Sequence, residues 1–402
     1  MTWQKVKLGE ICQSITDGDH QSIKKVASGV PIIKIKFIDS VGHLNLSEAQ
    51  YASEEYYNRL SEDRKAKKGD ILYSVVGTIG KTLLVKDNKR FVFDRDFAIL
   101  RVKDEKVIPE YLYYEMTSFP FYMQAYNLSR GAAQLHLFLS TIKRLEIFLP
   151  PLKVQRKIVD ILLNYDDLIA NCKKEIGLLE EAAQRIYREW FVNFRFPGHV
   201  IGSPLSEPAE KESATFTDGI PDGWQETTLG EIAPFKKGKV VTKSSIGEGN
   251  IPVIAGGLGP AYYTDKSNTS NRVITISASG ANAGFTRMYF EPIWASDCSF
   301  IDSSTTNEIF FVYCFLKNNI KAINNLQKGS AQPHVYAKDV NALAILCPTQ
   351  EMMSKFTRLV TPYFDSIAQN EKRISLLTEA RDRLLPKLMT GEIDVEQLSL
   401  IQ

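Results

Sequence analysis

Residues 158–190 read IVDILLNYDDLIANCKKEIGLLEEAAQRIYREW, and residues 356–388, which lie 198 positions later, read FTRLVTPYFDSIAQNEKRISLLTEARDRLLPKL. In the first stretch, apolar residues step forward by alternating fours and threes, which is the 3.5-residue period of a helix that packs lengthwise on a partner helix. The first stretch has ten positions in this pattern, and eight of the ten positions that lie 198 residues later are also apolar. Residues outside the pattern are repeated as well, for example Glu181 as Glu379. We therefore predict two copies of one long helix that pack on each other.

The predicted helices are separated by a globular segment, so the chain must fold back for them to meet, and they then run antiparallel. Such a pair would relate the two halves of the chain by an approximate two-fold axis. At about 1.5 Å per residue, the first stretch would span about 48 Å. The predicted seam residues are Ile158, Leu162, Ile169, Ile176, Leu179 and Ile186 in the first helix and Val360, Ile367, Ile374, Leu377 and Leu384 in the second.

The globular segments also repeat. Residues 3–11 and 224–232 both begin with Trp-Gln and end with Leu-Gly-Glu-Ile, and their numbers differ by 221. A later pattern recurs with a difference of only 198: Gly131, Gln134 and His136 match Gly329, Gln332 and His334. The difference falls by 23 within the globular part, so we expect two related domains with matching ends, of which the second is shorter in its middle.

The sequence predicts an α/β (α+β) fold in which two mixed domains are joined by two long helices that form an antiparallel coiled coil, with a pseudo-two-fold internal repeat. The predicted divisions are a first domain at 1–150, a first helix at 151–196, a linker at 197–221, a second domain at 222–348, a second helix at 349–391 and a tail at 392–402. Pro362 should kink the second helix or mark a fresh start, and Pro386 with Gly391 should end it.

Short β-rich runs bounded by turn residues, each followed by a helical pattern, indicate the interior of the domains. In the first domain the predicted strands are 30–38, 70–76 and 91–102, with a helix at 109–126. In the second they are 251–255, 272–277 and 299–302, with a helix at 309–326.

Composition narrows the class of protein. Hydrophobic residues make up 44% and charged residues 24%, which is ordinary for a soluble protein. The sequence has no run of about 18 apolar residues and no secretory signal pattern at its start, so we expect a cytoplasmic protein without a membrane contact. The five cysteines are scattered, and neither they nor the five histidines have metal-ligand spacing, so we expect no metal site.

One motif approaches a catalytic one. Residues 77–82 read Gly-Thr-Ile-Gly-Lys-Thr, but a phosphate-binding P-loop needs its first glycine at position 75, where this chain has Val75. An enzyme that uses a nucleotide through Lys81 is therefore one alternative, and a coiled-coil adaptor that never touches DNA is another. No nucleophile paired with a base can be proposed from spacing, so we expect no catalytic residue in this chain.

Basic and amide side chains cluster with glycines in predicted loops, including the run 64–68. Cations supply affinity for phosphates, and amide or guanidinium groups on loops can read base edges. The candidate DNA-binding residues are Lys24, Lys25, Lys34, Lys36, Lys81, Arg130, Gln134, His136, Lys236, Lys237, Lys239, Lys243, Arg287, Lys328, Gln332 and His334. The net charge of +2 neither favours nor excludes DNA binding, because a DNA-binding protein needs a local basic surface rather than a high overall positive charge.

The chain resembles the specificity subunit of type I restriction-modification systems over essentially its whole length. The motifs that carry the resemblance are the two domain starts at 3–11 and 220–232, the Leu-Pro-Pro-Leu opening of the first helix at 149–152, its closing segment at 190–198, and the closing segment of the second helix at 384–393. The second helix opens with Cys-Pro-Thr-Gln-Glu at 347–351, without the double proline of the first.

The resemblance implies that this chain is a non-catalytic subunit with two target-recognition domains. Each domain would read one half of a split double-stranded DNA target, and the helix pair would set the unread gap. It also implies docking of two adenine-N6 methyltransferase subunits and of motor-nuclease subunits, so that S-adenosylmethionine, ATP and Mg would be bound by the partners. Because the two domains differ internally, the two half-sites should differ, which gives an asymmetric target.

Overall fold

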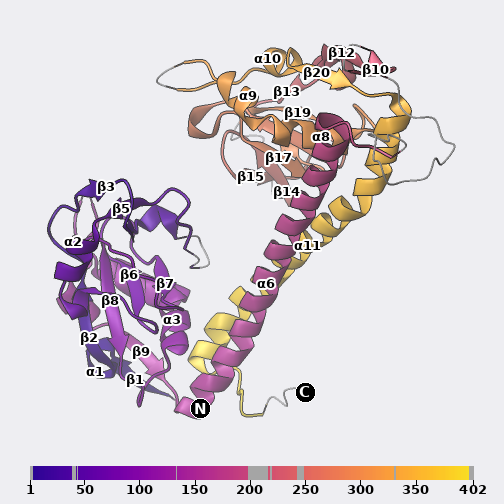
Figure 1. Cartoon of the computed structure of the whole chain (residues 1–402). Coiled ribbons are helices and arrows are strands. Elements are labelled where there is room, and N and C mark those ends of the chain that lie inside the picture. Colours follow the sequence, from indigo (N-terminus) through magenta and orange to yellow (C-terminus); the bar gives the residue numbers. More distant parts are fainter. Residues whose placement is uncertain are drawn as a thin grey trace, which may run out of the picture. The chain divides into compact units, whose positions relative to one another are not determined.

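The two predicted long helices are present as α6 (Leu152–Tyr187) and α11 (Gln350–Thr390) (Figure 1). A π-helical turn, η3 (Arg188–Val192), follows α6. The structure is a computed structural model that describes residues 3–38, 42, 44–132, 134–197, 216–217, 220–241, 249–329 and 332–397. It divides into a first unit, residues 1–170 with 374–402, and a second unit, residues 171–373, so that each unit contains one domain and part of both long helices.

In the first unit, the start of α6 packs against the end of α11. Ile158 and Leu162 are fully buried in one core cluster with Leu388. Farther along, Arg381 donates a hydrogen bond to Asp166 over 2.7 Å. Residue numbers therefore rise along α6 while those of the facing residues fall along α11, which confirms the antiparallel pairing within this unit.

In the second unit, the end of α6 packs against the start of α11. The rings of Tyr187 and Trp190 each lie 6.0 Å from the ring of Phe356. Closer to the start of α6, Ile176 and Leu179 pack on a cluster that contains Ile367 of α11. The pairing is antiparallel here as well.

The predicted seam residues face inward to different degrees. Those that are fully or almost fully buried are Ile158, Leu162, Ile169, Val360 and Ile367. Those that are partly buried are Ile176, Leu179, Ile186, Ile374, Leu377 and Leu384.

Both prolines of the second helix lie inside it. The prediction that Pro386 ends the helix is wrong, and so is a fresh start at Pro362, because α11 runs without interruption to Thr390. A proline inside a helix removes one backbone donor, and nearby hydroxyl groups form extra bonds to the backbone here: Thr361 donates to the carbonyl of Thr357 over 2.7 Å and Thr390 to that of Pro386 over 2.9 Å. The helix ends before Gly391, whose φ of 73° is the left-handed conformation of a helix C-terminus.

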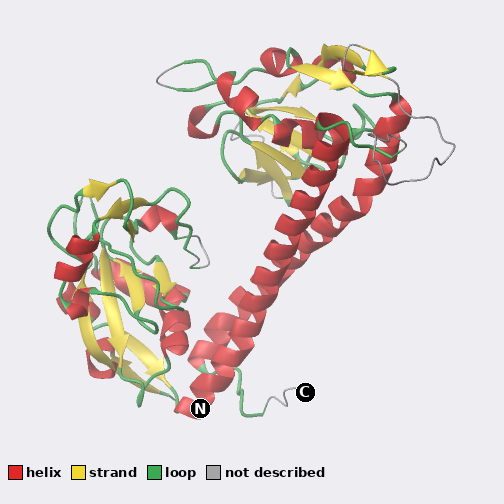
Figure 2. Cartoon of the chain, in the orientation of Figure 1, coloured by secondary structure: helices red, strands yellow, loops and turns green. Residues whose placement is uncertain are grey.

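The first domain is built on a four-stranded antiparallel sheet in the order β2-β8-β6-β7 (Figure 2). Its strands are β2 (Cys12–Asp17), β8 (Phe97–Val102), β6 (Ile71–Ser74) and β7 (Thr82–Leu84). A three-stranded sheet has the order β3 (Lys25–Val26), β5 (Gln50–Ala52) and β4 (Val30–Ile32). The helices are α1 (Leu8–Ile11), α2 (Glu54–Arg59), α3 (Pro109–Thr117), α4 (Phe119–Leu128) and α5 (Leu139–Ile142), with 3-10 turns η1 (Ile35–Phe37) and η2 (Glu62–Arg64).

The second domain repeats the four-stranded sheet, whereas its three-stranded sheet has a different strand order and one parallel pair. Its four-stranded sheet has the order β13 (Lys236–Lys237), β19 (Cys298–Ile301), β16 (Val273–Ser277) and β17 (Thr286–Tyr289). Its three-stranded sheet has the order β15 (Pro260–Thr264), β14 (Ile251–Ile254) and β18 (Trp294–Ala295). The helices are α7 (Leu229–Ile232), α8 (Ile309–Asn318), α9 (Ile320–Asn325) and α10 (Ala337–Asn341), with a 3-10 turn η5 (Gly280–Asn282). A short pair, β10 (Phe216–Thr217) with β11 (Ile220–Pro221), precedes the domain.

In each domain the first strand pairs with the last. β1 (Gln4–Lys7) is antiparallel to β9 (Glu146–Leu149), and β12 (Gln225–Thr228) is antiparallel to β20 (Ala344–Cys347). The repeated Trp-Gln motif and the apolar run before each long helix are therefore two sides of one two-stranded sheet. This shared topology confirms the internal repeat.

Several predicted elements are shorter than expected. The strand predicted at 30–38 is β4 followed by η1, and of the run 91–102 only residues 97–102 form a strand. The helix predicted at 109–126 is split into α3 and α4 at Ser118, whose side chain caps α4, with a proline in its first turn. Most of the predicted linker at 197–221 lies outside the described residues. Within the described ranges, no helix is both long enough and apolar enough to cross a membrane.

The seam can be tested with two leucines of the same helix. Leu162 is fully buried, whereas the side chain of Leu178 is 57% exposed. Leu162→Ala should lower the free energy of unfolding by about 3 kcal/mol, because it removes buried methyl groups and leaves a cavity. Leu178→Ala is the matched control and should change it by less than about 0.5 kcal/mol. Urea denaturation followed by circular dichroism measures both, and equal losses would contradict the assignment of the seam.

The carboxyl group of Glu115 on α3 gives a test of the first domain. Glu115 is only 6% exposed, and its Oε2 has no hydrogen-bond partner among the residues that the structure describes. Burial raises its pKa from the ordinary 4.5 to about 8. Between these two pH values the folded chain keeps a proton that the unfolded chain has released, so this group should make stability fall as the pH rises, by about 1.4 kcal/mol per pH unit.

Glu115→Gln should remove this contribution, because an amide does not titrate. Urea denaturation of both proteins at pH 5, 6, 7 and 8 measures the slope. Identical slopes in the two proteins would mean that Glu115 is ionised in the folded chain.

Candidate nucleic-acid interface

The repeated Gly, Gln and His residues form the same loop in both domains, which we call the Gln–His loop: residues 130–136 in the first domain and 328–334 in the second. In the first loop, Arg130 and His136 exchange two backbone hydrogen bonds of 2.9 and 2.7 Å. Gly131 has a φ of 122°, and a Cβ atom there would lie 2.1 Å from the carbonyl oxygen of Gln134. The tight turn therefore requires glycine.

The second loop has the same bonds. Lys328 and His334 exchange backbone hydrogen bonds of 2.9 and 2.8 Å. Gly329 has a φ of 94°, and a Cβ atom there would lie 2.8 Å from the carbonyl oxygen of Gln332. In both domains the spacing Gly-x-x-Gln-x-His thus places the glycine at a positive φ and the histidine in a backbone pair with the basic residue before that glycine.

Each Gln–His loop lies against a glycine turn of the main sheet. In the first domain, Gly77 donates a backbone hydrogen bond to Leu135 over 2.8 Å and Leu137 donates to Val75 over 2.9 Å. In the second, Gly280 donates to Pro333 over 3.0 Å and Val335 to Ala278 over 3.0 Å. The structure thereby brings together two sets of residues that the sequence analysis singled out separately.

The glycine turn at 77–82 is not a P-loop. A P-loop connects a strand to the N-terminus of a helix, whereas here β6 is followed by β7, with Tyr73 paired to Thr82. Lys81 begins the return strand of this hairpin, and its backbone N–H donates to the hydroxyl of Ser74 over 2.8 Å. The nucleotide-using alternative therefore loses its structural basis.

Aromatic side chains accompany both histidines. The ring of His136 is stacked near Phe138 at 6.5 Å, and that of His334 near Tyr336 at 6.0 Å. Phe138 is 56% and Tyr336 47% exposed, although both are large and partly or wholly apolar. Sequence reasoning missed these two aromatics, and their matching positions in the repeat were the signal that could have found them.

The other candidate cations of the first domain differ in their surroundings. Lys24 and Lys25 are exposed, and Lys25 lines a polar cavity of about 440 Å³. Lys34 lines the same cavity but forms an ion pair with Asp94, and Lys36 lies 3.7 Å from Glu48. Gln21, Gln50 and Arg95 also line this cavity. Sequence reasoning missed them, because they are far apart in the chain and share no motif.

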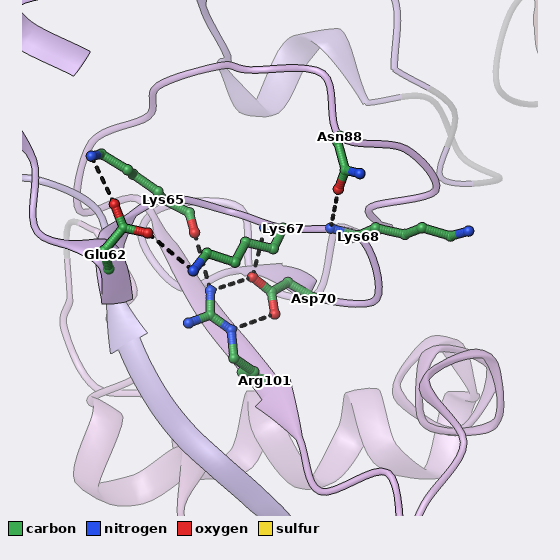
Figure 3. Close-up of polar contacts among 7 residues, drawn as sticks. All are labelled: Glu62, Lys65, Lys67, Lys68, Asp70, Asn88 and Arg101. Atoms are coloured by element: carbon green, nitrogen blue, oxygen red, sulfur yellow. Dashed lines mark hydrogen bonds and ion pairs between the residues drawn. The ribbon is translucent and has the colours of Figure 1, made fainter. Parts of the chain in front are cut away.

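Most of the basic run 64–68 is engaged within its own domain (Figure 3). Arg101 binds the carboxylate of the buried Asp70 through two hydrogen bonds of 2.9 and 2.7 Å. Lys65 and Lys67 each lie 3.0 Å from Glu62. Lys68 is exposed and points away from this cluster. The carboxylates of Glu62 and Asp70 therefore stabilise the loop at 64–68 and offset part of its positive charge.

The cations of the second domain also divide into two groups. Lys236, Lys237 and Lys239 are exposed. Arg287 lies 3.5 Å from Glu371, and Lys328 lies 2.7 Å from Asp339. Lys243 lies outside the described residues. DNA contact by the individual candidates in either domain stays a prediction.

Each domain is tied to the long helices of its own unit by polar contacts. In the first unit, the hydroxyl of Tyr114 on α3 donates to Asp166 of α6 over 2.6 Å, and Asp166 also accepts from Arg381 of α11. Burial raises the pKa of Tyr114, and the hydrogen bond to Asp166 raises it further, so the hydroxyl stays protonated.

In the second unit, Tyr313 of α8 donates to Glu180 of α6 over 3.2 Å, and Arg272 donates to Asp365 of α11 over 3.0 Å. Hydrogen bonds between side chains fix the angle of a domain on a helix in a way that apolar contacts alone do not. These contacts therefore orient each domain on its helices.

The fold defines a class of protein with two similar mixed domains, each carried on a pair of antiparallel helices. The model of the family described as "Type I restriction modification DNA specificity domain" matches residues 1–181 and 221–379. The chain belongs to this family, and its role is that of a DNA specificity subunit that is not an enzyme by itself.

Known relatives span the chain from end to end. The type I restriction enzyme MjaIX specificity subunit of Methanocaldococcus jannaschii is 29% identical, over 98% of this chain and 94% of the relative. The HindI specificity subunit of Haemophilus influenzae is 22% identical, over 97% of this chain and 99% of the relative. A crystal structure of a type I restriction-modification S subunit from M. genitalium has the same fold, with a TM-score of 0.56. It is 19% identical and covers 97% of this chain and 96% of its own.

The contact of Tyr114, Asp166 and Arg381 predicts a measurable coupling. The side chains of Asp166 and Arg381 are 17% and 12% exposed. Asp166→Ala should lower the free energy of unfolding by about 3 kcal/mol, because it leaves a largely buried guanidinium with one fewer carboxylate. The double variant Asp166→Ala, Arg381→Met should recover part of this loss, because it no longer buries the charge. Urea denaturation of the single and double variants tests this, and additive losses would contradict a direct interaction.

Proposed function

We propose that this chain reads a bipartite, asymmetric double-stranded DNA target, with one domain bound to each half-site. The observation that carries the proposal is that one framework occurs twice with different surroundings. Both domains have the same strand order in the four-stranded sheet and the same Gln–His loop. Their three-stranded sheets differ: β15 carries the exposed Tyr262 and Tyr263, whereas the corresponding sheet of the first domain borders a cavity lined by Gln50 and Lys34. Two related but unlike readers fit two unlike half-sites.

The long helices would set the gap between the half-sites and dock two methyltransferase subunits. The repeat supports two equivalent docking positions, because Leu178 of α6 and Leu376 of α11 lie 198 residues apart and are 57% and 56% exposed. An exposed leucine at the same position of both helices would offer each methyltransferase subunit the same apolar contact. In the relatives' class of system, motor-nuclease subunits would join the same complex, and the complex would act on DNA in the cytoplasm.

The chemistry of this complex would belong to the partners. Methyl transfer needs S-adenosylmethionine, and ATP-dependent cleavage needs ATP and Mg, all of which we assign to partner subunits. Among the residues that the structure describes, no group of three or more His, Cys, Asp or Glu side chains is placed to hold a metal ion. The alternative of an adaptor without DNA contact predicts no salt-dependent affinity, whereas phosphate contacts make log K fall with log salt.

Lengthening one long helix tests the proposed division of labour. Four residues inserted after Glu175 add one helical turn, about 6 Å. The unread gap of the methylated target should become longer while both half-sites keep their sequences. Methylation-sensitive sequencing of a host genome with and without this chain identifies the target and its gap.

The matched control is the pair of substitutions Lys174→Ala and Glu175→Ala without an insertion, because both side chains are exposed and the helix keeps its length. It should leave half-sites and gap unchanged. If the insertion alters the sequence of a half-site, the helices do more than set the distance, and the proposal fails. A chain that confers no methylated motif at all contradicts the DNA-reading role.

A further inference from the structure

We infer that the two Gln–His loops bind the sugar-phosphate backbone of DNA, once in each half-site, and do not read bases. This inference rests on the proposed function and adds to it a division between the surfaces that position the DNA and those that read it. Four observations on the described residues carry it: the repetition of the loop, its backbone attachment to the main sheet, its side-chain chemistry and one difference between the copies.

The repetition concerns surface side chains that the core does not need. Leu137 and Val335, just after the loops, are 3% and 1% exposed, so packing explains them. Gln134 and Gln332 are exposed, so packing does not explain why the same amide stands at the same place in both domains. A surface that is the same in two readers of different sequences suits a ligand that is the same in both half-sites, and the deoxyribose-phosphate chain is such a ligand.

Backbone hydrogen bonds attach each loop to the main sheet. The basic residue and the histidine of each loop exchange two of these bonds, and two more join the loop to a glycine turn of the main sheet. In the first domain a Cβ atom on Gly77 would lie 3.4 Å from Nε2 of Gln134, so the amide lies over that turn. Contacts to phosphate fix the register of a protein on the duplex, and residues attached to the sheet in this way suit such contacts.

The side chains are donors rather than carboxylates. Arg130 or Lys328, a glutamine and a histidine occur in each loop, and N–H groups of these types are common partners of phosphate oxygens. The glycines keep the backbone bare, so that it can approach the DNA closely. Phe138 and Tyr336, exposed beside the histidines, offer a flat surface on which a sugar ring can pack.

The two copies differ in one charge. Lys328 is already paired with Asp339, 2.7 Å away. The position in the first domain that corresponds to Asp339, 198 residues earlier, holds Thr141, and within the described residues Arg130 has no ion pair with a carboxylate. Neutralising Arg130 should therefore remove more of the salt dependence of binding than neutralising Lys328.

The experiment measures the affinity of the full chain for two labelled duplexes by fluorescence anisotropy. One carries the methylated target found above, and the other has both half-sites scrambled. The double variant Gln134→Ala, Gln332→Ala should weaken binding to both duplexes by the same factor, about thirtyfold, because it removes two hydrogen bonds that contribute about 1 kcal/mol each. The matched control is Gln13→Ala, an exposed glutamine on β2 outside the loops, which should leave both affinities unchanged.

Two further variants use charge. Gln134→Glu with Gln332→Glu should weaken binding to both duplexes more than the alanines do, because carboxylates repel phosphates. Arg130→Gln should reduce the slope of log K against log salt by about 0.9, the value for one phosphate contact, and Lys328→Gln by less. Thermal unfolding confirms that each variant is folded.

A loss confined to the target duplex would mean that the loops read bases, and it would overturn the inference. Unchanged DNA binding would overturn it as well, and if the same variant then failed to assemble with the methyltransferase subunits, the loops would be a protein contact. The proposed function fails in a different way: the unaltered chain would bind both duplexes equally, whatever the variants do.

Discussion

The packing of α6 on α11 is the interaction on which the remainder of the structure depends. Within the first unit, the start of α6 shares a core with the end of α11 and with α3 of the first domain. Within the second unit, the end of α6 shares a core with the start of α11 and with α8 of the second domain. Each domain therefore shares one of its core clusters with both helices, and a helix pair with an apolar seam buries surface that the domain would otherwise leave in water.

Polar contacts then give direction to this apolar packing. Asp166 receives hydrogen bonds from a tyrosine of the first domain and an arginine of α11, and Glu180 receives one from a tyrosine of the second domain. The two domains thus use the same kind of contact with different residues. The DNA contacts proposed for the domain loops need such a fixed orientation, because a rotation of a domain on its helices would displace its loops.

The sequence predicted the helices well, because a seam with a 3.5-residue period is a local pattern that a reader can count. It also predicted the domain ends and the Gln–His loop, because the chain contains two versions of each. The sheet order was out of reach, since β2 pairs with β8 across more than 80 residues and no local pattern encodes that pairing. The prediction that Pro386 ends the second helix was wrong for a physical reason. A proline inside a helix costs about 3 kcal/mol, and tertiary packing of the buried Leu385 and Leu388 offsets that cost.

The candidate site was predictable only in part. Counting lysines could not reveal that Lys34 faces Asp94, 60 positions away, or that Lys328 faces Asp339. The carboxylates that bind these cations decide how much positive charge remains for a ligand, and they are distant in sequence or hidden in a helix pattern. By contrast, the loop residues Gln134 and His136 were found because repetition marks a residue independently of its surroundings.

The pairing of β1 with β9, and of β12 with β20, has a consequence for how such chains change over time. Because the chain enters and leaves each domain on adjacent strands, the interior of a domain can gain or lose residues without moving the points where it joins the helices. The 23-residue difference between the two domains lies between such fixed ends. New surfaces can thus arise by insertion, deletion or recombination, while the helical scaffold, on which we propose that partner subunits dock, stays the same.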